Sequence, residues 1–546
     1  MSKITDLVVL VVMDGWGLAP AGPGNAVTNA YTPNLQKFMA AYPHTILSAS
    51  GESVGLSRGE PGNTETGHLN LGAGRIVYQD LPRINLSIAD GSFFKNPIFL
   101  QAIAHCRTNN SNLHLMGLIG AGGIHANNEH LFALIRLCRE QKFERVFLHL
   151  FTDGRDSPPT STAAYLAHLD NVIKREKIGT IATIMGRYWG MDRDLRWDRT
   201  EKAYRALTAG LGKKVNNPQE AIEQAYQAGQ TDEFIEPSVV IDEQGVPRGK
   251  ICDNDAVIFY NFRIDRPRQL TRAFVLPDFE KQQVNWDFDP YMTKYYQKHN
   301  IKIDERKVFH RGEPLANLFF ATMTQYEKNL PIHVAYPPEI VDLPLGRILS
   351  EAGLRQLRAA ESEKERFVGF YFNGQQEASF PGEDRLTIPS PAVATYNLKP
   401  DMSAKELTEA VINKLRENSS EYGFVLVNYA NADMVGHTGD LAATMEACTA
   451  VDACVGRLTE AATDLNGVIV ITADHGNAEV KLNAQTGGKS TEHTANPVPL
   501  MIVGPPFLGK PQNLASGILA DVAPTILYLL GIAQPSVMTG RNLLSI

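Results

Sequence analysis

Short apolar runs recur along this chain, and they limit the folds open to it more than any other feature. Each run is six or seven residues long and rich in β-branched and aromatic side chains; they occupy residues 7–13, 146–152, 180–185, 256–262, 318–324, 424–430, 467–472 and 498–503. Runs of this length between turn-forming residues are typical of strands. Because the runs are apolar throughout, they predict strands that are buried on both faces.

Between these runs the hydrophobic spacing becomes helical. Over residues 442–463, Met445, Cys448, Val451 and Leu458 recur at intervals of three or more and share one stripe of a helix. Strands that alternate with helices favour parallel sheets covered by helices. The fold class that we predict is therefore α/β.

Two turn-rich stretches have the character of joints between domains. Residues 72–82 begin with Gly-Ala-Gly and end in proline, and residues 336–344 contain a Pro-Pro pair. Proline and glycine are common at domain boundaries. We predict two domains: a discontinuous one of residues 1–78 and 339–546, and an inserted one of residues 79–338.

The overall composition is that of an ordinary globular protein. Hydrophobic residues make up 43 % and charged residues 21 %, with a net charge of −8 at pH 7. These values exclude the disordered, collagen-like and coiled-coil classes. No acidic or basic tail interrupts the mixture, so we expect no nucleic-acid partner. A site for an anion would have to be a local cluster of Arg and Lys.

Cysteine usage and the first apolar run bear on the compartment. The chain has five cysteines, an odd number, and no CxxC pair, which argues against a disulfide framework and a cysteine zinc site. Residues 7–13 are too short to cross a membrane and lack the layout of a signal peptide. We therefore expect a cytoplasmic protein with no membrane partner.

Aspartate and histidine residues gather beside the ends of several apolar runs. They are Asp14, Asp433, His437, Asp474, His475 and His493. Ligand sites of α/β proteins lie at the carboxyl ends of strands, and mixed carboxylate and imidazole ligands suit manganese or zinc better than calcium. Six such ligands are enough for two divalent ions, which can hold both oxygens of a phosphoryl transfer. The alternative, that each is an ordinary turn or surface residue, is weakened by their recurrence.

A hydroxyl group precedes a predicted helix in the segment Gly-Asn-Thr-Glu-Thr-Gly-His, residues 62–68. Thr64 would lie near the N-terminus of that helix, where backbone N–H groups can hold a phosphate. A hydroxyl whose pKa is lowered by a metal can act there as a nucleophile. The residues alone leave open the alternative that Thr64 only caps the helix, with Gly67 as a break.

Arginine-rich segments follow three apolar runs in the middle of the chain. They contain Arg155 and Asp156, Arg187 and Arg193, and Arg263 and Arg266. The planar fork of arginine binds carboxylate and phosphate, so several converging arginines suit a small, doubly anionic substrate. Asp156 could serve as an acid or base in such a site. The alternative is a set of solvated salt bridges.

Several long motifs occur in a fixed order: GHLNLGAGRIVYQ, FTDGRDSPP, GRYWGMDRD, FRIDRPRQL, FPGEDR, DMVGHTGD, TADHGNAE and EHTANPVP. In these motifs the chain resembles the cofactor-independent, or 2,3-bisphosphoglycerate-independent, phosphoglycerate mutases of the alkaline phosphatase superfamily. The resemblance runs from Met13 to Arg541. It implies an α/β fold in which an alkaline-phosphatase-like metal-binding domain is interrupted by an inserted α/β transferase domain that binds the substrate.

The resemblance also implies a role for each matching residue. Asp433, His437 and His493 would hold one manganese ion, and Asp14, Thr64, Asp474 and His475 would contact a second. Lys364 would neutralise the phosphoryl group. The glycerate and its phosphate would be held by His125, Arg155, Asp156, Arg187, Arg193, Arg263 and Arg266, with Asp156 as the acid or base.

The implied activity is the interconversion of 3-phosphoglycerate and 2-phosphoglycerate in glycolysis and gluconeogenesis. Thr64 would take the phosphoryl group, the glycerate would reorient on the arginine cluster, and its 2-hydroxyl, deprotonated by Asp156, would take the group back. The partner is thus a small molecule, phosphoglycerate, and we expect the enzyme to be a monomer.

Three segments depart from the family pattern. The family nucleophile is a serine, and the methyl group of Thr64 restricts its χ1. Residues 120–127, Gly-Ala-Gly-Gly-Ile-His-Ala-Asn, lack the Asp and second His of the usual Ser-Asp-Gly-Gly-Val-His-Ser-His, and residues 283–311 match only loosely. Thr64 and the loop at residues 120–127 motivate one alternative, a metal-dependent phosphohydrolase or a mutase for another phosphosugar. A second alternative, a catalytically silent binding protein, is opposed by the presence of all six candidate Asp and His ligands.

Overall fold

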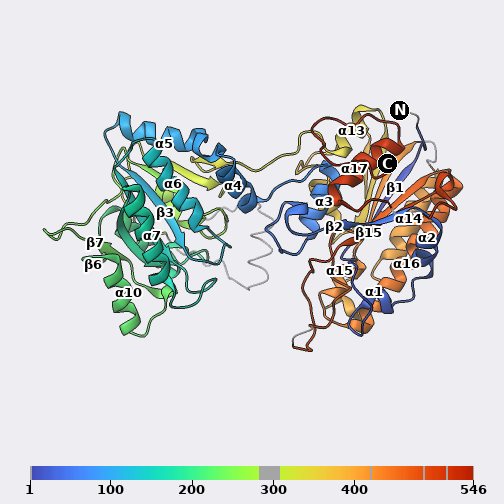
Figure 1. Cartoon of the computed structure of the whole chain (residues 1–546), viewed down its shortest axis with the longest axis horizontal. Helices are drawn as coiled ribbons and strands as arrows, with labels where there is room; N and C mark the ends of the chain where they lie inside the picture. Colours follow the sequence, from blue (N-terminus) through green and yellow to red (C-terminus); the bar gives the residue numbers. More distant parts are fainter. Residues whose placement is uncertain (1–2, 282–307, 418–420, 484–485, 512–513, 545–546) are drawn as a thin grey trace. The chain divides into compact units, whose positions relative to one another are not determined.

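The computed structural model describes residues 3–281, 308–417, 421–483, 486–511 and 514–544. The chain divides into two compact units: unit 1 comprises residues 1–82 and 339–546, and unit 2 comprises residues 83–338. Figure 1 shows unit 1 in blue and in yellow to red, because it combines the two ends of the chain. The first boundary follows Pro82 rather than residue 78. Of the loosely matching segment 283–311, residues 283–307 lie outside the described part of the chain.

Unit 1 is built on a sheet that has eight strands in the described part of the chain. In spatial order its strands are β12 (Glu383–Ile388), β11 (Arg355–Glu361), β13 (Tyr422–Tyr429), β1 (Val8–Met13), β14 (Val468–Thr472), β15 (Val498–Val503), β2 (His44–Ser48) and β16 (Gly517–Ile518). The strands from β12 to β14 are parallel, whereas β15 is antiparallel to both β14 and β2. A parallel sheet was the wrong expectation for β15, because a fully buried apolar run carries no signal for strand direction.

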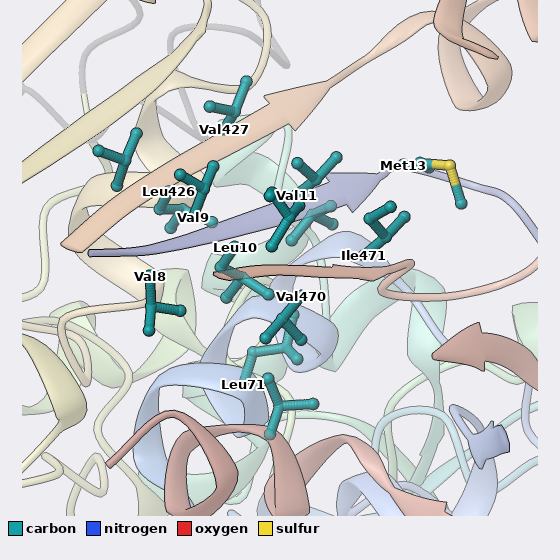
Figure 2. Close-up of a cluster of buried hydrophobic side chains, with 14 of the residues drawn as sticks. Val8, Val9, Leu10, Val11, Met13, Leu71, Leu426, Val427, Val470 and Ile471 are labelled. Atoms are coloured by element: carbon teal, nitrogen blue, oxygen red, sulfur yellow. The ribbon is translucent and has the colours of Figure 1, made fainter. Parts of the chain in front are cut away.

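Strand β1 lies between β13 and β14 and forms the centre of the hydrophobic core of unit 1. All six of its residues are buried. Figure 2 shows Val8 and Leu10 leaving one face of the strand and Val9 and Val11 leaving the other. Core side chains meet both sets, which explains why the run has no polar alternation.

Helices join and cover the strands of unit 1. They are α1 (Ala26–Asn29), α2 (Pro33–Ala41), α3 (Thr64–Ala73), α13 (Leu345–Glu351), α14 (Ala404–Glu417), α15 (Asn431–Gly436), α16 (Leu441–Asp464) and α17 (Val522–Leu529). Helix α16 confirms the helix predicted over residues 442–463, and its N-cap Asp440 accepts a hydrogen bond from the Ala443 N–H.

Unit 2 has its own sheet, which is eight-stranded over the residues that the structure describes. Its spatial order is β10 (His333–Tyr336), β9 (Phe319–Thr324), β8 (Ala256–Phe259), β3 (Leu113–Ile119), β4 (Val146–Thr152), β5 (Thr180–Gly186), β7 (Ser238–Val240) and β6 (Lys213–Val215). Strands β10 to β5 are parallel, and β7 is antiparallel to β5. The helices are α5 (Pro97–Thr108), α6 (Asn128–Glu140), α7 (Thr162–Glu176), α8 (Arg187–Gly190), α9 (Trp197–Thr208), α10 (Pro218–Gln227) and α11 (Arg268–Val275), and α4 (Asp80–Ala89) spans the boundary between the units.

The predicted α/β class is confirmed, and each unit contains a sheet of its own. Across the described ranges, no helix combines the length and the apolarity that crossing a membrane requires.

Candidate active site

Four adjacent parallel strands of unit 1 deliver charged side chains to one edge of the sheet. Asp14 directly follows β1, Asp433 lies in α15 after β13, Asp474 follows β14, and Lys364 follows β11. Parallel strands end at the same edge, and the register here sets the last residue of β1 opposite the last residue of β13. Residues that are hundreds of positions apart in sequence are thereby brought within contact distance.

Thr64 is the first residue of α3, and Asn63 is the N-cap. The Asn63 side chain accepts a hydrogen bond from the Thr66 N–H at 3.0 Å. The interpretation of Thr64 as a simple cap is therefore wrong. Gly67 lies inside the helix and does not break it; a Cβ there would come 2.6 Å from the Asp474 Cβ. Glycine at this position is what lets α3 approach Asp474.

The Thr64 hydroxyl lies at the centre of the acidic and basic groups. Its Oγ1 is 3.0 Å from His475 Nε2, 3.4 Å from Asp14 Oδ1, and accepts a hydrogen bond from Lys364 Nζ at 3.0 Å. Thr64 itself is buried. The hydroxyl thus has a cation, an imidazole and a carboxylate within reach of its oxygen.

Lys364 joins two of the carboxylates. Its buried ammonium group donates to Asp14 Oδ1 at 2.8 Å and to Asp433 Oδ2 at 2.7 Å. Burial alone would lower the pKa of Lys364, but the charges of Asp14 and Asp433 outweigh it and raise this pKa above its ordinary value. Lys364 is therefore a fixed positive charge beside the Thr64 oxygen.

Three histidines present the same ring nitrogen to the carboxylates. Each directs Nδ1 at a backbone carbonyl: His437 at Thr491 O, His493 at Gly62 O and His475 at Gly476 O, at 2.8, 2.9 and 3.2 Å. A carbonyl only accepts, so Nδ1 carries the proton in the neutral ring and Nε2 has a free lone pair. This is the usual arrangement of metal-binding histidines, whose second nitrogen is held by a carbonyl or carboxylate.

The Nε2 atoms of the three rings converge on the aspartates. Asp433 Oδ1 lies 3.2 Å from His437 Nε2 and 3.1 Å from His493 Nε2. His475 Nε2 lies between the groups, 3.4 Å from Asp14 Oδ1 and 4.0 Å from Asp433 Oδ1. Burial would lower the pKa of His475, but the charges of Asp474 and Asp14 raise it to about 10. Without a bound cation, the aspartates hold a proton on this ring.

These side chains fit divalent metal ions. Two groups have ligand atoms that lie within 4.8 Å of one another: Asp433, His475 and His493, and Asp14, His68 and Asp474. Among the described residues, three buried aspartates gather here and the ammonium of Lys364 contacts two of them, so negative charge is in excess and cations would compensate it. All six predicted Asp and His ligands and Thr64 belong to this constellation.

His68 and Asn428 belong to the same constellation, although the sequence did not predict either of them. His68 Nδ1 donates to the Thr64 carbonyl at 3.0 Å and lies 3.2 Å from Asp474 Oδ2. Asn428 Nδ2 lies 3.1 Å from His68 Nε2 and donates to Asp14 Oδ2 at 2.8 Å. The only sequence signal was the position of His68, four residues after Thr64 on one helix face.

Unit 2 holds a second polar cluster, at the carboxyl ends of β4 and β5. Arg187, which is 1 % exposed, donates through Nη1 to Asp153 Oδ1 at 2.6 Å and to Asp156 Oδ2. Burial would raise the pKa of Asp156, but the hydrogen bond and charge of Arg187 hold it below its ordinary value. Asp156 is thus a carboxylate at neutral pH.

His125 is buried in the same cluster. Its Nε2 lies 3.5 Å from Asp156 Oδ2, and its Nδ1 lies 3.7 Å from Asp265 Oδ1. Burial, together with the charge of Arg187, lowers the pKa of His125 to about 3. The ring is therefore neutral and can donate a hydrogen bond from one nitrogen only.

Asp265 pairs with two further arginines of the cluster, although the sequence did not predict a role for it. It forms ion pairs with Arg193 and with Arg263, whose Nε lies 3.1 Å from Asp265 Oδ1. Burial, together with the charges of Arg187 and Arg193, lowers the pKa of Arg266 to about 10.

Arg155 stands apart from the other predicted arginines. Its side chain is 56 % exposed and lies 3.5 Å from Glu233. The arginines at 187, 193, 263 and 266 share neighbouring charges, whereas Arg155 only adds to the field around Arg266.

The loop at residues 120–127 is tied to the same cluster in spite of its unusual sequence. Ser157 Oγ accepts hydrogen bonds from Ala121 N at 3.0 Å and Gly122 N at 3.2 Å. The same hydroxyl donates to Asp153 Oδ2 at 2.7 Å, and Asp153 also binds Arg187. Ser157 therefore links the loop backbone to the buried ion pair without the missing aspartate.

Comparison with known proteins agrees with this description. Residues 84–328 match the family model "BPG-independent PGAM N-terminus", and residues 356–505 match the model "Alkaline phosphatase". The solved structure of a Leishmania mexicana phosphoglycerate mutase, determined at low cobalt concentration, is similar with a TM-score of 0.56 and 29 % identity, covering 99 % of this chain and 98 % of that one.

Relatives match over nearly the whole chain. A 2,3-bisphosphoglycerate-independent phosphoglycerate mutase of Chloroflexus aggregans is 50 % identical over 541 residues, 98 % of each chain. An enzyme of the same name from Moorella thermoacetica is 47 % identical over 537 residues, again 98 % of each. One from Methanosarcina barkeri is 46 % identical over 545 residues, 100 % of this chain and 99 % of the relative. The chain belongs to the enzyme family of 2,3-bisphosphoglycerate-independent phosphoglycerate mutases.

Proposed function

We propose that this enzyme interconverts 3-phosphoglycerate and 2-phosphoglycerate, and that Thr64 carries the phosphoryl group between the two. The observation that carries this proposal is the position of the Thr64 hydroxyl. It lies at the N-terminus of α3 and within hydrogen-bond distance of Lys364 and His475. Helix N-termini favour bound phosphate groups.

We propose that unit 1 holds two divalent ions, most suitably manganese. Asp433, His437 and His493 would bind one, and Asp14, Asp474 and His475, with Thr64, would bind the other. When bound, such ions lower the pKa of a hydroxyl and offset the charge of a phosphoryl group. Lys364 would neutralise a further phosphoryl oxygen, and the Nδ1 hydrogen bonds of the histidines would hold their rings in place.

The cluster of unit 2 is proposed to bind the glycerate. Arg187, Arg193, Arg263 and Arg266 would hold its carboxylate and phosphate, with His125 and Arg155 as further contacts. Asp156 is ionised at neutral pH, so it can accept the proton of a glycerate hydroxyl before that hydroxyl takes back the phosphoryl group. Because glycerate keeps the same cations throughout, it can be phosphorylated again at the other carbon.

The test is a coupled assay with 3-phosphoglycerate and manganese in the absence of 2,3-bisphosphoglycerate. Enolase reports 2-phosphoglycerate, and a parallel measurement reports free phosphate. We expect 2-phosphoglycerate that disappears with a chelator and with Thr64→Ala. Free phosphate without 2-phosphoglycerate would instead establish a phosphohydrolase.

Mass spectrometry of substrate-treated enzyme identifies the residue that carries the phosphoryl group, independently of the product assay. We expect a phosphate on Thr64, and a phosphate on any other residue would contradict its role.

We also propose a cytoplasmic monomer with no nucleic-acid partner, in line with the charge distribution of the sequence. Light scattering at assay concentration tests the monomer.

A further inference from the structure

A buried lysine near the candidate metal centre has no part in the scheme above. Lys481 is 0 % exposed, and its Nζ donates to the Gly436 carbonyl at 2.8 Å and to Asn477 Oδ1. Both acceptors are neutral. Among the described residues, no carboxylate oxygen lies within 4.0 Å of this ammonium. An ion buried against neutral partners is unusual, because desolvation is costly without an opposite charge in contact.

One acceptor of Lys481, the side chain of Asn477, contacts a candidate metal ligand directly. An ammonium group has three donors and no acceptor, so the Asn477 amide must turn its oxygen toward Lys481. Its Nδ2 then donates to Asp433 Oδ1 at 2.9 Å. This is the oxygen that the Nε2 atoms of His437 and His493 face. Lys481 thus fixes the orientation of the Asn477 amide. In this orientation the NH₂ group donates a hydrogen bond to Asp433, whereas the opposite orientation would place the amide oxygen against the carboxylate.

The other acceptor of Lys481, the carbonyl of Gly436, lies next to the same group of ligands. Gly436 is the last residue of α15, the helix that contains Asp433, and His437 follows it. A Cβ at position 436 would lie 2.6 Å from Asn477 Oδ1 and 3.3 Å from Lys481 Nζ. Glycine is therefore required here for Asn477 and Lys481 to pack against the end of the helix.

We propose that Lys481 is a positioning residue for the divalent-cation site of Asp433, His437 and His493, acting through Asn477 on Asp433 and through the Gly436 carbonyl on the segment that carries His437. The inference rests on the proposed function, since it assumes that these residues bind a cation. It assigns Lys481 no contact with substrate. Groups that orient metal ligands in this way typically contribute about 10- to 100-fold to metal affinity.

The test is a manganese titration of the metal-stripped full-length protein, with free Mn²⁺ followed by electron paramagnetic resonance. We expect two sites in the wild type. Lys481→Met should weaken one of them by about 10-fold or more and leave the other unchanged. Asn477→Ala should weaken the same site by a similar factor. The double variant should fall short of the product of the two single effects, because the two residues act in one chain of contacts.

Lys405→Met is the matched control, since Lys405 is 66 % exposed on α14. It should bind Mn²⁺ as the wild type does. The thermal unfolding temperature of each metal-free variant is measured alongside, because a purely structural role would lower it without weakening one site selectively. If Lys481→Met does not fold, Lys481→Gln replaces it; its amide can still donate to one acceptor, so a smaller loss at the same site is expected.

The outcomes are distinguishable. Folded Lys481 and Asn477 variants that bind two Mn²⁺ with wild-type affinity overturn this inference and leave the proposed function standing. Equal weakening of both sites, or strictly multiplicative effects in the double variant, also overturns it. A wild-type protein that binds no Mn²⁺ overturns the metal-dependent function and the inference together.

Discussion

We expect Glu361 to make the stability of unit 1 depend on pH, and replacing it with glutamine should remove that contribution. The residue ends β11 and is 0 % exposed. Its Oε1 accepts a hydrogen bond from the Ser403 N–H at 3.0 Å, whereas Oε2 is buried with no hydrogen bond from the described residues. Burial raises the pKa of Glu361 from 4.5 to about 7. Glutamine preserves the oxygen that Ser403 contacts and is always neutral.

The direction of the change in stability with pH follows from which protonation form of Glu361 the folded state favours. The folded state favours the protonated acid, so the contribution of Glu361 to stability is fully present below pH 4.5 and is lost as pH rises through 7. The free energy of unfolding falls by up to about 1.36 kcal/mol per pH unit, but only between the two pKa values of 4.5 and about 7. The loss between pH 5 and pH 8 is therefore about 2.5 kcal/mol. The difference in unfolding free energy between Glu361→Gln and wild type should grow by about this amount over that range. Any constant penalty from an unpaired amide cancels in the comparison.

Urea unfolding followed by circular dichroism, at several pH values and with a chelator present, measures this difference. Glu351→Gln is the matched control, because Glu351 is 55 % exposed on α13, and its difference from wild type should stay within about 0.5 kcal/mol. Parallel stability curves for wild type and Glu361→Gln between pH 5 and 8 would refute the reasoning.

Three further predictions concern the site and the core. Thr64→Ser keeps an alcohol at the N-terminus of α3 and should form a phosphoserine in mass spectrometry, whereas Thr64→Ala should lose at least about 10³-fold in kcat. Asp265→Asn removes the charge that gathers Arg193 and Arg263, so KM should rise by about 10-fold with a smaller change in kcat, as steady-state assays will show. Leu426→Ala removes a fully buried side chain of β13 beside β1 and should lower the free energy of unfolding by about 2–5 kcal/mol in urea titrations (Figure 2).

The sequence predicts the apolar strands well and the polar ones poorly. Residues 146–152 and 498–503 match β4 and β15 in both bounds, because turn-forming residues flank each apolar run. Strand β11 was missed, since its sequence RQLRAAE contains few apolar residues. Its Arg358 is buried, with the guanidinium 4.9 Å from the centre of the Phe372 ring and 5.1 Å from that of Phe424. The sequence of β11 itself contains no sign of these two rings, so the burial of Arg358 could not be predicted from it.

The same limit applies to the site. Asp14 and Asp474 could be predicted because each directly follows an apolar run and the carboxyl ends of parallel strands meet. Asn428 could not, since its partners Asp14 and His68 are 414 and 360 positions away in the sequence. Lys481 could not either, because a lysine in sequence predicts an exposed side chain. Residues that act through a second residue become visible only with the three-dimensional contacts.

The central place of β1 has a consequence for synthesis on the ribosome. This strand is made before the other strands of unit 1, yet it pairs with β13 and β14, which begin roughly 410–460 residues later. At about 5–20 residues per second, its six apolar residues wait roughly 20–80 s for their neighbours. Unit 2 is contiguous in sequence and can fold during that delay. The nascent chain therefore carries an unpaired, aggregation-prone strand for most of its synthesis, and it is this stage at which a holdase chaperone would protect the enzyme.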